Sequence, residues 1–192
     1  CDFVHLRPHA AETVQVSCNH PQVPTDRTNL AFRAAALMQQ NYPGCGGVDI
    51  VIEKNIPVGA GLAGGSTNAA AVLVGLDRLW DLGLTQPELH ELAAKLGSDV
   101  PFCISGGTAL AVGRGEVLSP LPDLDRLALA ICKPRQISIS TAWAYQTFRA
   151  ENLLSTSPIE DRHYSSQMLA AIATNEDDNY GRIGRLLYND LE

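Results

Sequence analysis

The stretch that decides the fold runs from residue 57 to residue 69 and reads PVGAGLAGGSTNA, with four glycines within seven residues. It stands between a strand-like apolar segment at 48–53 and an apolar segment at 68–81 that predicts a helix. Glycine allows left-handed backbone and close approach to a ligand, and a helix N-terminus adds unpaired N–H donors and partial positive charge. We therefore expect an anion site here, most often one for phosphate. The plain alternative is a linker or a tight strand-to-helix turn.

A dinucleotide-binding motif fits this loop only in part. Gly59, Gly61 and Gly64 satisfy G-x-G-x-x-G. In a Rossmann unit the first glycine closely follows its strand, and a second strand ends in an acidic residue about 20 positions later. Here residues 55–58 intervene, and two helical patterns follow in succession. A nicotinamide oxidoreductase is therefore disfavoured.

A P-loop fits no better. The spacing of Gly59 and Gly64 suits G-x-x-x-x-G-K-[ST], but Gly65 stands where that motif places its lysine. Without the lysine, the loop has to bind phosphate through backbone donors and the helix dipole. Ser66 and Thr67 could add hydroxyl groups or help to hold Mg²⁺.

Composition excludes several classes of protein. The 192 residues are 45% hydrophobic and 18% charged, which is enough apolar material for a core. The net charge of −7, without a cluster of Lys or Arg, disfavours nucleic acid as a partner. No apolar run approaches 18 residues, so no membrane span is expected. Five scattered cysteines without C-x-x-C predict reduced, buried thiols rather than a disulfide scaffold or a zinc site.

The rest of the chain mixes strands and helices without strict alternation, which predicts an α+β fold. Thr85 and Glu88 form a capping-box pattern at the start of one helix, and Gly97 is placed to end it. Gly113-Arg114-Gly115 predicts a hairpin turn, with Arg114 as a turn residue only. Strands are expected at two places within 1–19 and at 48–53, 108–112, 116–118 and 127–132, and helices at 28–40, 68–81, 86–96, 141–149, 164–173 and 181–191.

One carboxylate stands out. Asp99 lies between Gly97 and Pro101, which fix a non-helical backbone, and apolar residues surround it. Its local sequence suits two roles: an N-cap for a short helix at 100–104, or a catalytic base.

These motifs together resemble the GHMP kinases, whose second motif is P-x-x-x-G-L-[AG]-[SG]-[SG]-[SA]. The similarity is strongest to the branch that phosphorylates a cytidine-diphosphate sugar alcohol. It covers KNIPVGAGLAGGSTNAAAVLVGL at 54–76 and LGSDVPFCISGGTALAVGRGEVLSPLP at 96–122, and it extends to 28–30 and to 188–192. The double glycine at 64–65 separates this branch from relatives with serines there.

The resemblance implies a GHMP kinase fold in two parts. Residues 1–122 would form the N-terminal, ATP-binding domain, similar to domain 2 of ribosomal protein S5 but without its first strand. Residues 123–192 would begin a ferredoxin-like C-terminal domain. Family members carry an earlier strand with a catalytic lysine and a tyrosine-histidine pair, and a later glycine-rich motif. None of these is found in the sequence, so we expect a truncated copy that is catalytically poor by itself.

The resemblance also implies an activity: transfer of the γ-phosphate of ATP, with Mg²⁺, to the 2-hydroxyl of 4-(cytidine 5′-diphospho)-2-C-methyl-D-erythritol in the non-mevalonate isoprenoid pathway. It makes Asp99 the catalytic base. Asn29 would contact the nucleotide or simply cap a helix, Lys54 would meet phosphate or merely end a strand, and Thr141 would line the substrate pocket or cap a helix. The ATP-binding residues of the loop would be Pro57, Val58, Gly59, Ala60, Gly61, Leu62, Ala63, Gly64, Gly65, Ser66 and Thr67.

Two alternatives of function stay open at this point. One is a non-catalytic sugar- or nucleotide-binding module with the same fold, although a pure binder has no need of a base at Asp99. The other is a different small-molecule kinase of the family. The expected location is the bacterial cytoplasm, or the plastid stroma for a plant-type source.

Overall fold

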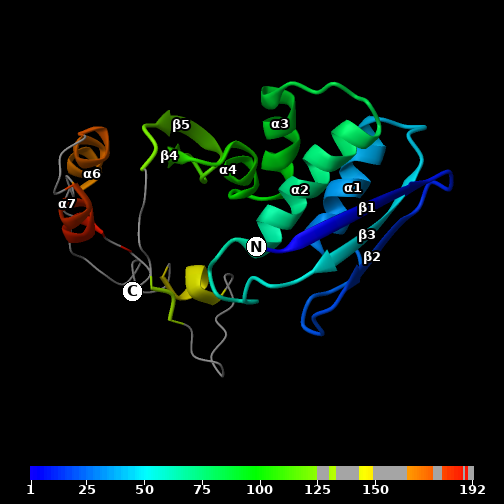
Figure 1. Cartoon of the computed structure of the whole chain (residues 1–192), viewed down its shortest axis with the longest axis horizontal. Helices are drawn as coiled ribbons and strands as arrows, with labels where there is room; N and C mark the ends of the chain where they lie inside the picture. The colour runs from blue at the N-terminus through cyan, green and yellow to red at the C-terminus, as the bar shows by residue number, and fades with distance from the viewer. Residues whose placement is uncertain (125–129, 133–142, 149–163, 175–178, 188, 190–192) are drawn as a thin grey trace. The chain divides into compact units, whose positions relative to one another are not determined.

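The computed structural model describes residues 1–124, 130–132, 143–148, 164–174, 179–187 and 189. The chain divides into two compact units, residues 1–119 and residues 120–192. The first unit holds the glycine-rich stretch and Asp99, and both units contain helices (Figure 1).

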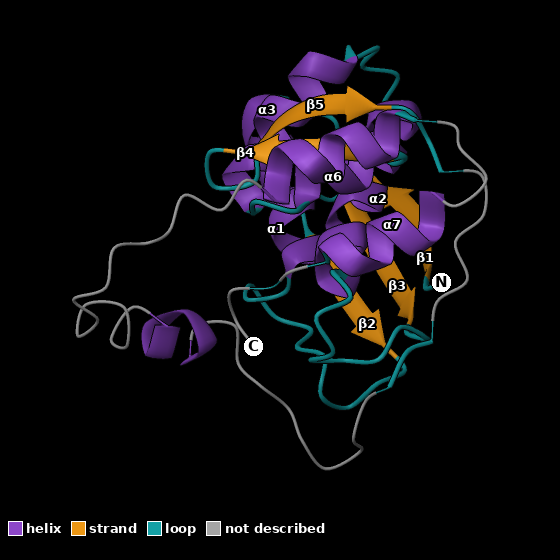
Figure 2. Ribbon diagram, turned by 90° about the vertical axis from the view of Figure 1, so that its left-hand side faces the viewer, coloured by secondary structure: helices purple, strands orange, loops and turns teal. Residues whose placement is uncertain are grey.

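A three-stranded sheet forms one layer of the first unit. Its strands are β1 (Phe3–His9), β2 (Val14–Cys18) and β3 (Gly47–Glu53), in the order β1-β3-β2. Strand β3 runs antiparallel to β1 and parallel to β2. Figure 2 shows β3 between its two neighbours. The parallel pair requires a crossover between β2 and β3, and helix α1 supplies it.

Period-two alternation gives this sheet one apolar face. Val48, Ile50 and Ile52 of β3 are fully buried, while the residues between them are partly exposed. The register places Val4 opposite Ile52 and Val16 opposite Ile50, so apolar side chains of all three strands share this face. Helices pack on it and close the core of the unit.

Helix α1 (Leu30–Asn41) agrees with the helix expected at 28–40. Helix α2 (Gly64–Leu79) begins four residues before the expected Asn68 and ends two residues before Asp81. The sequence placed Gly64 in the loop because glycine has low helix propensity. In the first turn, however, no N–H needs an intrahelical partner, so glycine is tolerated there.

Helix α3 (Gln86–Leu96) begins with the expected capping box, and Gly97 follows its last residue. A short helix, α4 (Val100–Ser105), comes next, and it leads into the hairpin of β4 (Thr108–Val112) and β5 (Val117–Leu121). Arg114 is the expected turn residue: its side chain is 78% exposed, and its Nε lies 3.6 Å from Oε1 of Glu116.

The second unit contains helix α6 (Tyr164–Ala173), as expected, and helix α7 (Asn179–Leu186), which pack against each other. Helix α7 begins two residues before the expected 181, and residues 187 and 189 are not helical. Residues 143–148 are helical within the expected 141–149. Residues 130–132 are not a strand, contrary to the expectation for 127–132, whose other positions lie outside the described residues.

The described elements confirm the α+β class. Among them, no helix combines the length and the apolar character needed to cross a membrane.

Candidate phosphate-binding and catalytic site

The glycine loop, residues 57–63, joins the end of β3 to the start of α2 and turns with left-handed backbone at three of its seven residues. Gly59 has φ 64°, Gly61 has φ 70° and Ala63 has φ 50°. A non-glycine residue in this region is uncommon and pays a steric cost, because its Cβ crowds the following carbonyl. The strain at Ala63 falls directly before α2, at the N-cap position of the helix.

The N-terminus of α2 is left open. Ala63 has no side chain that could cap it, and the first turn of the helix contains no acidic residue. The N–H of Thr67 donates to the carbonyl of Ala63 at 2.9 Å, as the first intrahelical bond. The N–H groups that precede Thr67 in this turn therefore have no intrahelical partner and point out of the helix end. The helix dipole is positive at the same end, and the two features together favour binding of an anion.

The two hydroxyl groups of this turn differ in their use. Thr67 Oγ1 donates to the carbonyl oxygen of Ala63 at 3.0 Å and lies 3.5 Å from Cys103 Sγ. Because the hydroxyl proton goes to Ala63, the Cys103 thiol is the donor in this contact, and one lone pair of Thr67 Oγ1 stays available to a cation. The Ser66 hydroxyl makes no hydrogen bond to any side chain or backbone group that the structure describes, so it is free to donate to a phosphate oxygen.

The two glycines of the first turn face different neighbours. A Cβ on Gly64 would lie 2.6 Å from Lys54 Nζ and 3.0 Å from Ile56 Cγ2. A Cβ on Gly65 would meet Leu30 Cδ1 at 3.6 Å, an ordinary contact. The close approach at Gly64 is therefore to Lys54 and Ile56 inside the protein, rather than to a ligand. The contact at Gly65 brings the start of α1 beside the start of α2.

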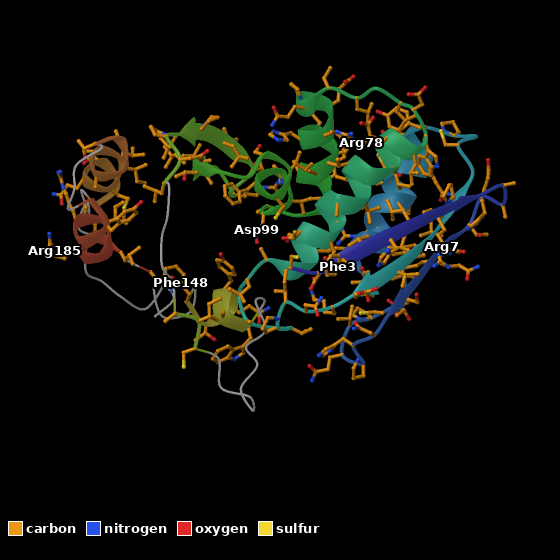
Figure 3. All side chains as sticks on the ribbon, viewed as in Figure 1. Phe3, Arg7, Arg78, Asp99, Phe148 and Arg185 are labelled. Carbon is orange, nitrogen blue, oxygen red and sulfur yellow. The ribbon has the colours of Figure 1, made fainter. Side chains whose placement is uncertain are left out.

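Asp99 stands at the N-cap position of α4, but its side chain does not cap the helix. Its backbone is in the right-handed helical region, and no capping hydrogen bond to its carboxylate is found among the described residues. The contact between Thr67 and Cys103 joins the first turn of α2 to α4. In Figure 3, Asp99 lies beside the end of α2 at which that helix begins. The structure thus brings an uncommitted carboxylate to the open helix end.

Asn29 was expected either to contact the nucleotide or to cap a helix, and the structure shows it as the N-cap of α1. Its Oδ1 accepts from the N–H of Ala31 at 2.8 Å, and its Nδ2 donates to the carbonyl of Pro24 at 2.5 Å. The residue is 7% exposed. A contact with nucleotide stays a prediction. Thr141, expected at the substrate pocket, lies outside the described residues.

Lys54 has a partner that the sequence did not suggest. Its ammonium group donates to Oδ2 of Asp2, and Oδ1 of Asp2 accepts from the N–H groups of Asn55 and Ile56, both at 2.7 Å. Burial alone raises the pKa of Asp2, but the hydrogen bonds from Ile56, Lys54 and Asn55 and the charge of Lys54 together lower it. Asp2 was missed because 52 residues separate it from Lys54.

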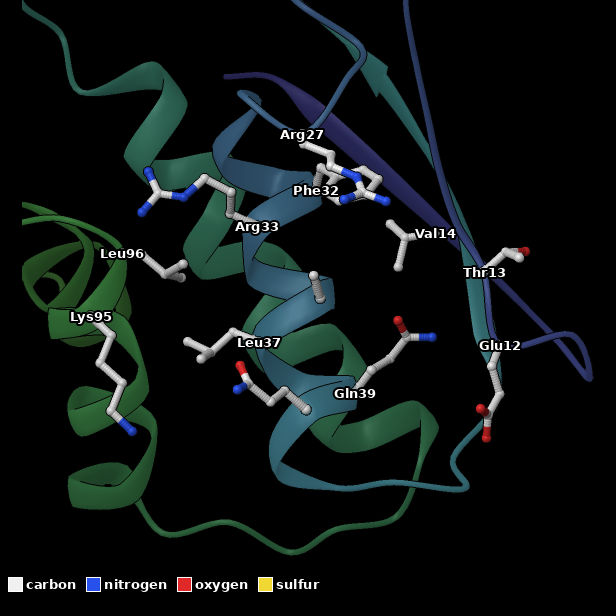
Figure 4. Close-up of a pocket in the computed structure, with 12 residues that line it drawn as sticks. Glu12, Thr13, Val14, Arg27, Phe32, Arg33, Leu37, Gln39, Lys95 and Leu96 are labelled. Atoms are coloured by element: carbon white, nitrogen blue, oxygen red, sulfur yellow. The ribbon is translucent and has the colours of Figure 1, made fainter.

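A pocket of about 630 Å³ lies away from this site, along α1 (Figure 4). None of the residues that line it belongs to the glycine loop or to α4. Its charged side chains are exposed and point in different directions, so they form no convergent site. Its apolar floor and charged rim include Val14, Phe32 and Leu37, and Glu12, Arg27, Arg33 and Lys95.

No group of His, Cys, Asp or Glu suited to hold a metal occurs within the described ranges. All five cysteines are free thiols, as expected, but none of them is buried. The glycine loop and the first turn of α2 offer hydroxyl oxygens to a cation, which suit a Mg²⁺ ion that phosphate groups hold.

Part of the chain is similar to a known protein family. Residues 29–107 match the family described as GHMP kinases N terminal domain. A solved structure of homoserine kinase from Cytophaga hutchinsonii, 17% identical, superposes with a TM-score of 0.70 over 95% of this chain and 62% of that one, and shows the shared fold. The described fold is that of the N-terminal domain of the GHMP kinases, to which residues 29–107 are similar.

Within that family, two similar curated relatives are 4-diphosphocytidyl-2-C-methyl-D-erythritol kinases. The one from Acaryochloris marina is 55% identical, and the one from Gloeobacter violaceus is 57% identical, each over the whole of this chain. A crystal structure of 4-(cytidine 5′-diphospho)-2C-methyl-D-erythritol kinase is 32% identical, with a TM-score of 0.64 over 99% of this chain and 62% of that one. The chain spans 63% and 61% of the length of the two relatives.

Proposed function

We propose that this chain forms the nucleotide-binding and catalytic part of an ATP-dependent small-molecule kinase. Its substrate would be 4-(cytidine 5′-diphospho)-2-C-methyl-D-erythritol, and the γ-phosphate would go to the 2-hydroxyl. The observation that carries the proposal is the open N-terminus of α2 beside the carboxylate of Asp99, which caps no helix. The names of the relatives support the choice of substrate.

The loop supplies binding in this proposal. The phosphates of ATP lie against the N–H groups of the first turn of α2, and Ser66 donates a hydrogen bond to them. Donors that are already fixed before the reaction stabilise charge on the transferring group without reorganisation. Mg²⁺, held by the phosphates and met by the oxygen of Thr67, would neutralise part of that charge.

Asp99 supplies the base. As the 2-hydroxyl oxygen forms its bond to the γ-phosphorus, the bond from that phosphorus to the bridging oxygen breaks and ADP leaves. The proton of the hydroxyl passes to the carboxylate of Asp99. Such general-base assistance contributes about 10²–10⁴ in rate. A module that only binds nucleotide has no need of a free carboxylate at this position.

The domain assignment and the location belong to the same proposal. Residues 1–122 would be the N-terminal domain of the kinase, and residues 123–192 the first part of its C-terminal domain. The kinase would work in the bacterial cytoplasm or in a plastid stroma, with a small molecule rather than nucleic acid or a membrane as its partner.

The test measures binding and transfer separately. Calorimetry with Mg²⁺ and a non-hydrolysable ATP analogue should give saturable binding to the 192-residue chain. ADP release should depend on the cytidine substrate, and homoserine should not replace it. Binding without any substrate-dependent ADP release in a sensitive single-turnover assay would favour the non-catalytic module. Absence of binding at millimolar nucleotide would remove the proposal.

A further inference from the structure

Asp2 connects the start of the first strand to the entry of the glycine loop. It directly precedes β1, and its carboxylate accepts three hydrogen bonds from the segment after β3: one from the Lys54 ammonium and two from backbone N–H groups, of Asn55 and Ile56. The side chains of Lys54 and Asp2 are only 5% and 2% exposed. This is a buried, fully engaged ion pair, unlike a surface salt bridge.

Lys54 extends this connection to the other end of the loop. Its Nζ lies where a Cβ on Gly64, the first residue of α2, would be only 2.6 Å away. The loop therefore leaves the Asp2–Lys54 pair at Ile56 and returns to it at Gly64. Between these points, residues 57–62 make no backbone–backbone hydrogen bond to another segment within the described part of the chain. The pair is thus hydrogen-bonded to the entry of the loop, and the Lys54 side chain lies against Gly64 at its exit.

The pair is better suited to hold the loop than to supply charge to a ligand. A lone ammonium group beside a helix N-terminus is repelled by the dipole, whereas Asp2 compensates that charge. If Lys54 moved to a phosphate, the carboxylate of Asp2 would stay buried without its cation, which is costly. Lys54 therefore stays with Asp2.

We propose that Asp2 and Lys54 are positioning residues for nucleotide binding: their ion pair fixes the entry of the glycine loop and packs against its exit at Gly64, so that the N–H donors of the loop are preformed for phosphate. This inference rests on the proposed function, in which the loop binds ATP. Fixing donors before binding removes an ordering cost that the ligand would otherwise meet.

Two measurements on Lys54→Met test the pair. Calorimetry with the Mg²⁺-bound ATP analogue should show at least a tenfold weaker Kd. NMR relaxation of the ligand-free protein should show order parameters of residues 57–63 falling from about 0.85 to below about 0.6. The matched control is Glu53→Gln, which removes the exposed pair of His5 and Glu53, 3.0 Å apart, between the same two strands. It should change neither measurement by more than twofold.

The outcomes separate the pair from the function. A folded Lys54→Met protein with wild-type affinity and an ordered loop overturns the proposal, because the pair then only stabilises the fold. The wild type could also fail to bind nucleotide while Lys54→Met still loses loop order. That result would support the pair as the group that orders the loop, and it would reject the proposed function. If Lys54→Met does not fold, the neutral pair Asp2→Asn with Lys54→Met is measured in its place, with the same expected and contrary results.

Discussion

Helices α2 and α3 begin in opposite ways, although they follow each other in the same unit. The start of α3 is closed by its own sequence. The N–H and the hydroxyl of Thr85 both donate to Oε2 of Glu88, at 2.8 and 2.6 Å, within a capping box. The start of α2 has Ala63 in a left-handed conformation, no side-chain cap and no acidic residue.

The difference separates a helix end built for stability from one built for a ligand. At α3 the protein satisfies the terminal donors and supplies the negative charge that the dipole favours. At α2 the backbone is strained at Ala63, and the N–H donors of the first turn have no partner. Neither feature stabilises the fold, so both point to a ligand. The start of α4 adds a third case, since Asp99 occupies the N-cap position without capping.

The largest expected effect contrasts the carboxylates of Asp99 and Glu88. In the complete enzyme, Asp99→Asn should lower kcat by roughly 10²–10⁴, equivalent to about 3–5 kcal/mol, because the amide cannot accept the proton. The Kd for ATP and the free energy of unfolding should change little. Glu88→Gln is the control, with full activity and a lower melting temperature. A loss of less than tenfold in kcat for Asp99→Asn would mean that Asp99 is not the base.

The next effect separates the two glycines of the first turn of α2. Gly64→Val places a Cβ against Lys54 and Ile56, and such overpacking costs about 1–3 kcal/mol. Calorimetry should show ATP affinity lower by roughly 10–100-fold, since the loop end moves. Gly65→Ala, whose Cβ meets only Leu30, should stay within about threefold of wild type. Equal losses in both variants would contradict the inward role of Gly64.

A third substitution gives α2 the kind of start that α3 has. Ala63→Asp should cap the open donors, and aspartate tolerates the left-handed backbone better than alanine does. We expect a gain of about 0.5–1 kcal/mol in the free energy of unfolding and at least a roughly tenfold loss of ATP affinity. Ala63→Asn caps without charge and should lose less affinity. A capped variant that binds ATP as wild type does would show that phosphate lies elsewhere.

Local signals predicted most of the fold. The alternation in 48–53 and the capping box at Thr85 gave β3 and the start of α3, because those patterns act between near neighbours. The start of α2 was placed too late, because propensity scales describe helix interiors rather than the first turn.

The site was predictable in its parts but not in its connections. The glycines and Asp99 were identified from their neighbours in sequence. The role of Asp2 and the inward contact of Gly64 could not be predicted from sequence, because both depend on segments that only the fold brings together. That Asp99 does not cap α4 also depends on backbone angles that sequence does not specify.

The smallest expected effect lies at the closed helix end. Thr85→Ala removes the hydroxyl partner of Glu88 and should lower the free energy of unfolding by about 1 kcal/mol, measured by urea denaturation. ATP affinity should not change, because α3 takes no part in phosphate binding in our proposal. Thr85→Ser keeps the hydroxyl and should behave nearly as wild type.

The pH dependence of this small effect identifies its cause. Hydrogen bonds from the hydroxyl and then the N–H of Thr85 lower the pKa of Glu88 from its ordinary value of 4.5. A carboxylate with a lowered pKa contributes stability that is fully present above the ordinary value and disappears as the pH falls through the lowered one. The difference between wild type and Thr85→Ala should therefore be constant from pH 6 to pH 8 and shrink below about pH 4. A difference that persists unchanged in acid would mean that Thr85 stabilises α3 without the Glu88 carboxylate, and the closed end of α3 would then depend on the backbone of the cap alone.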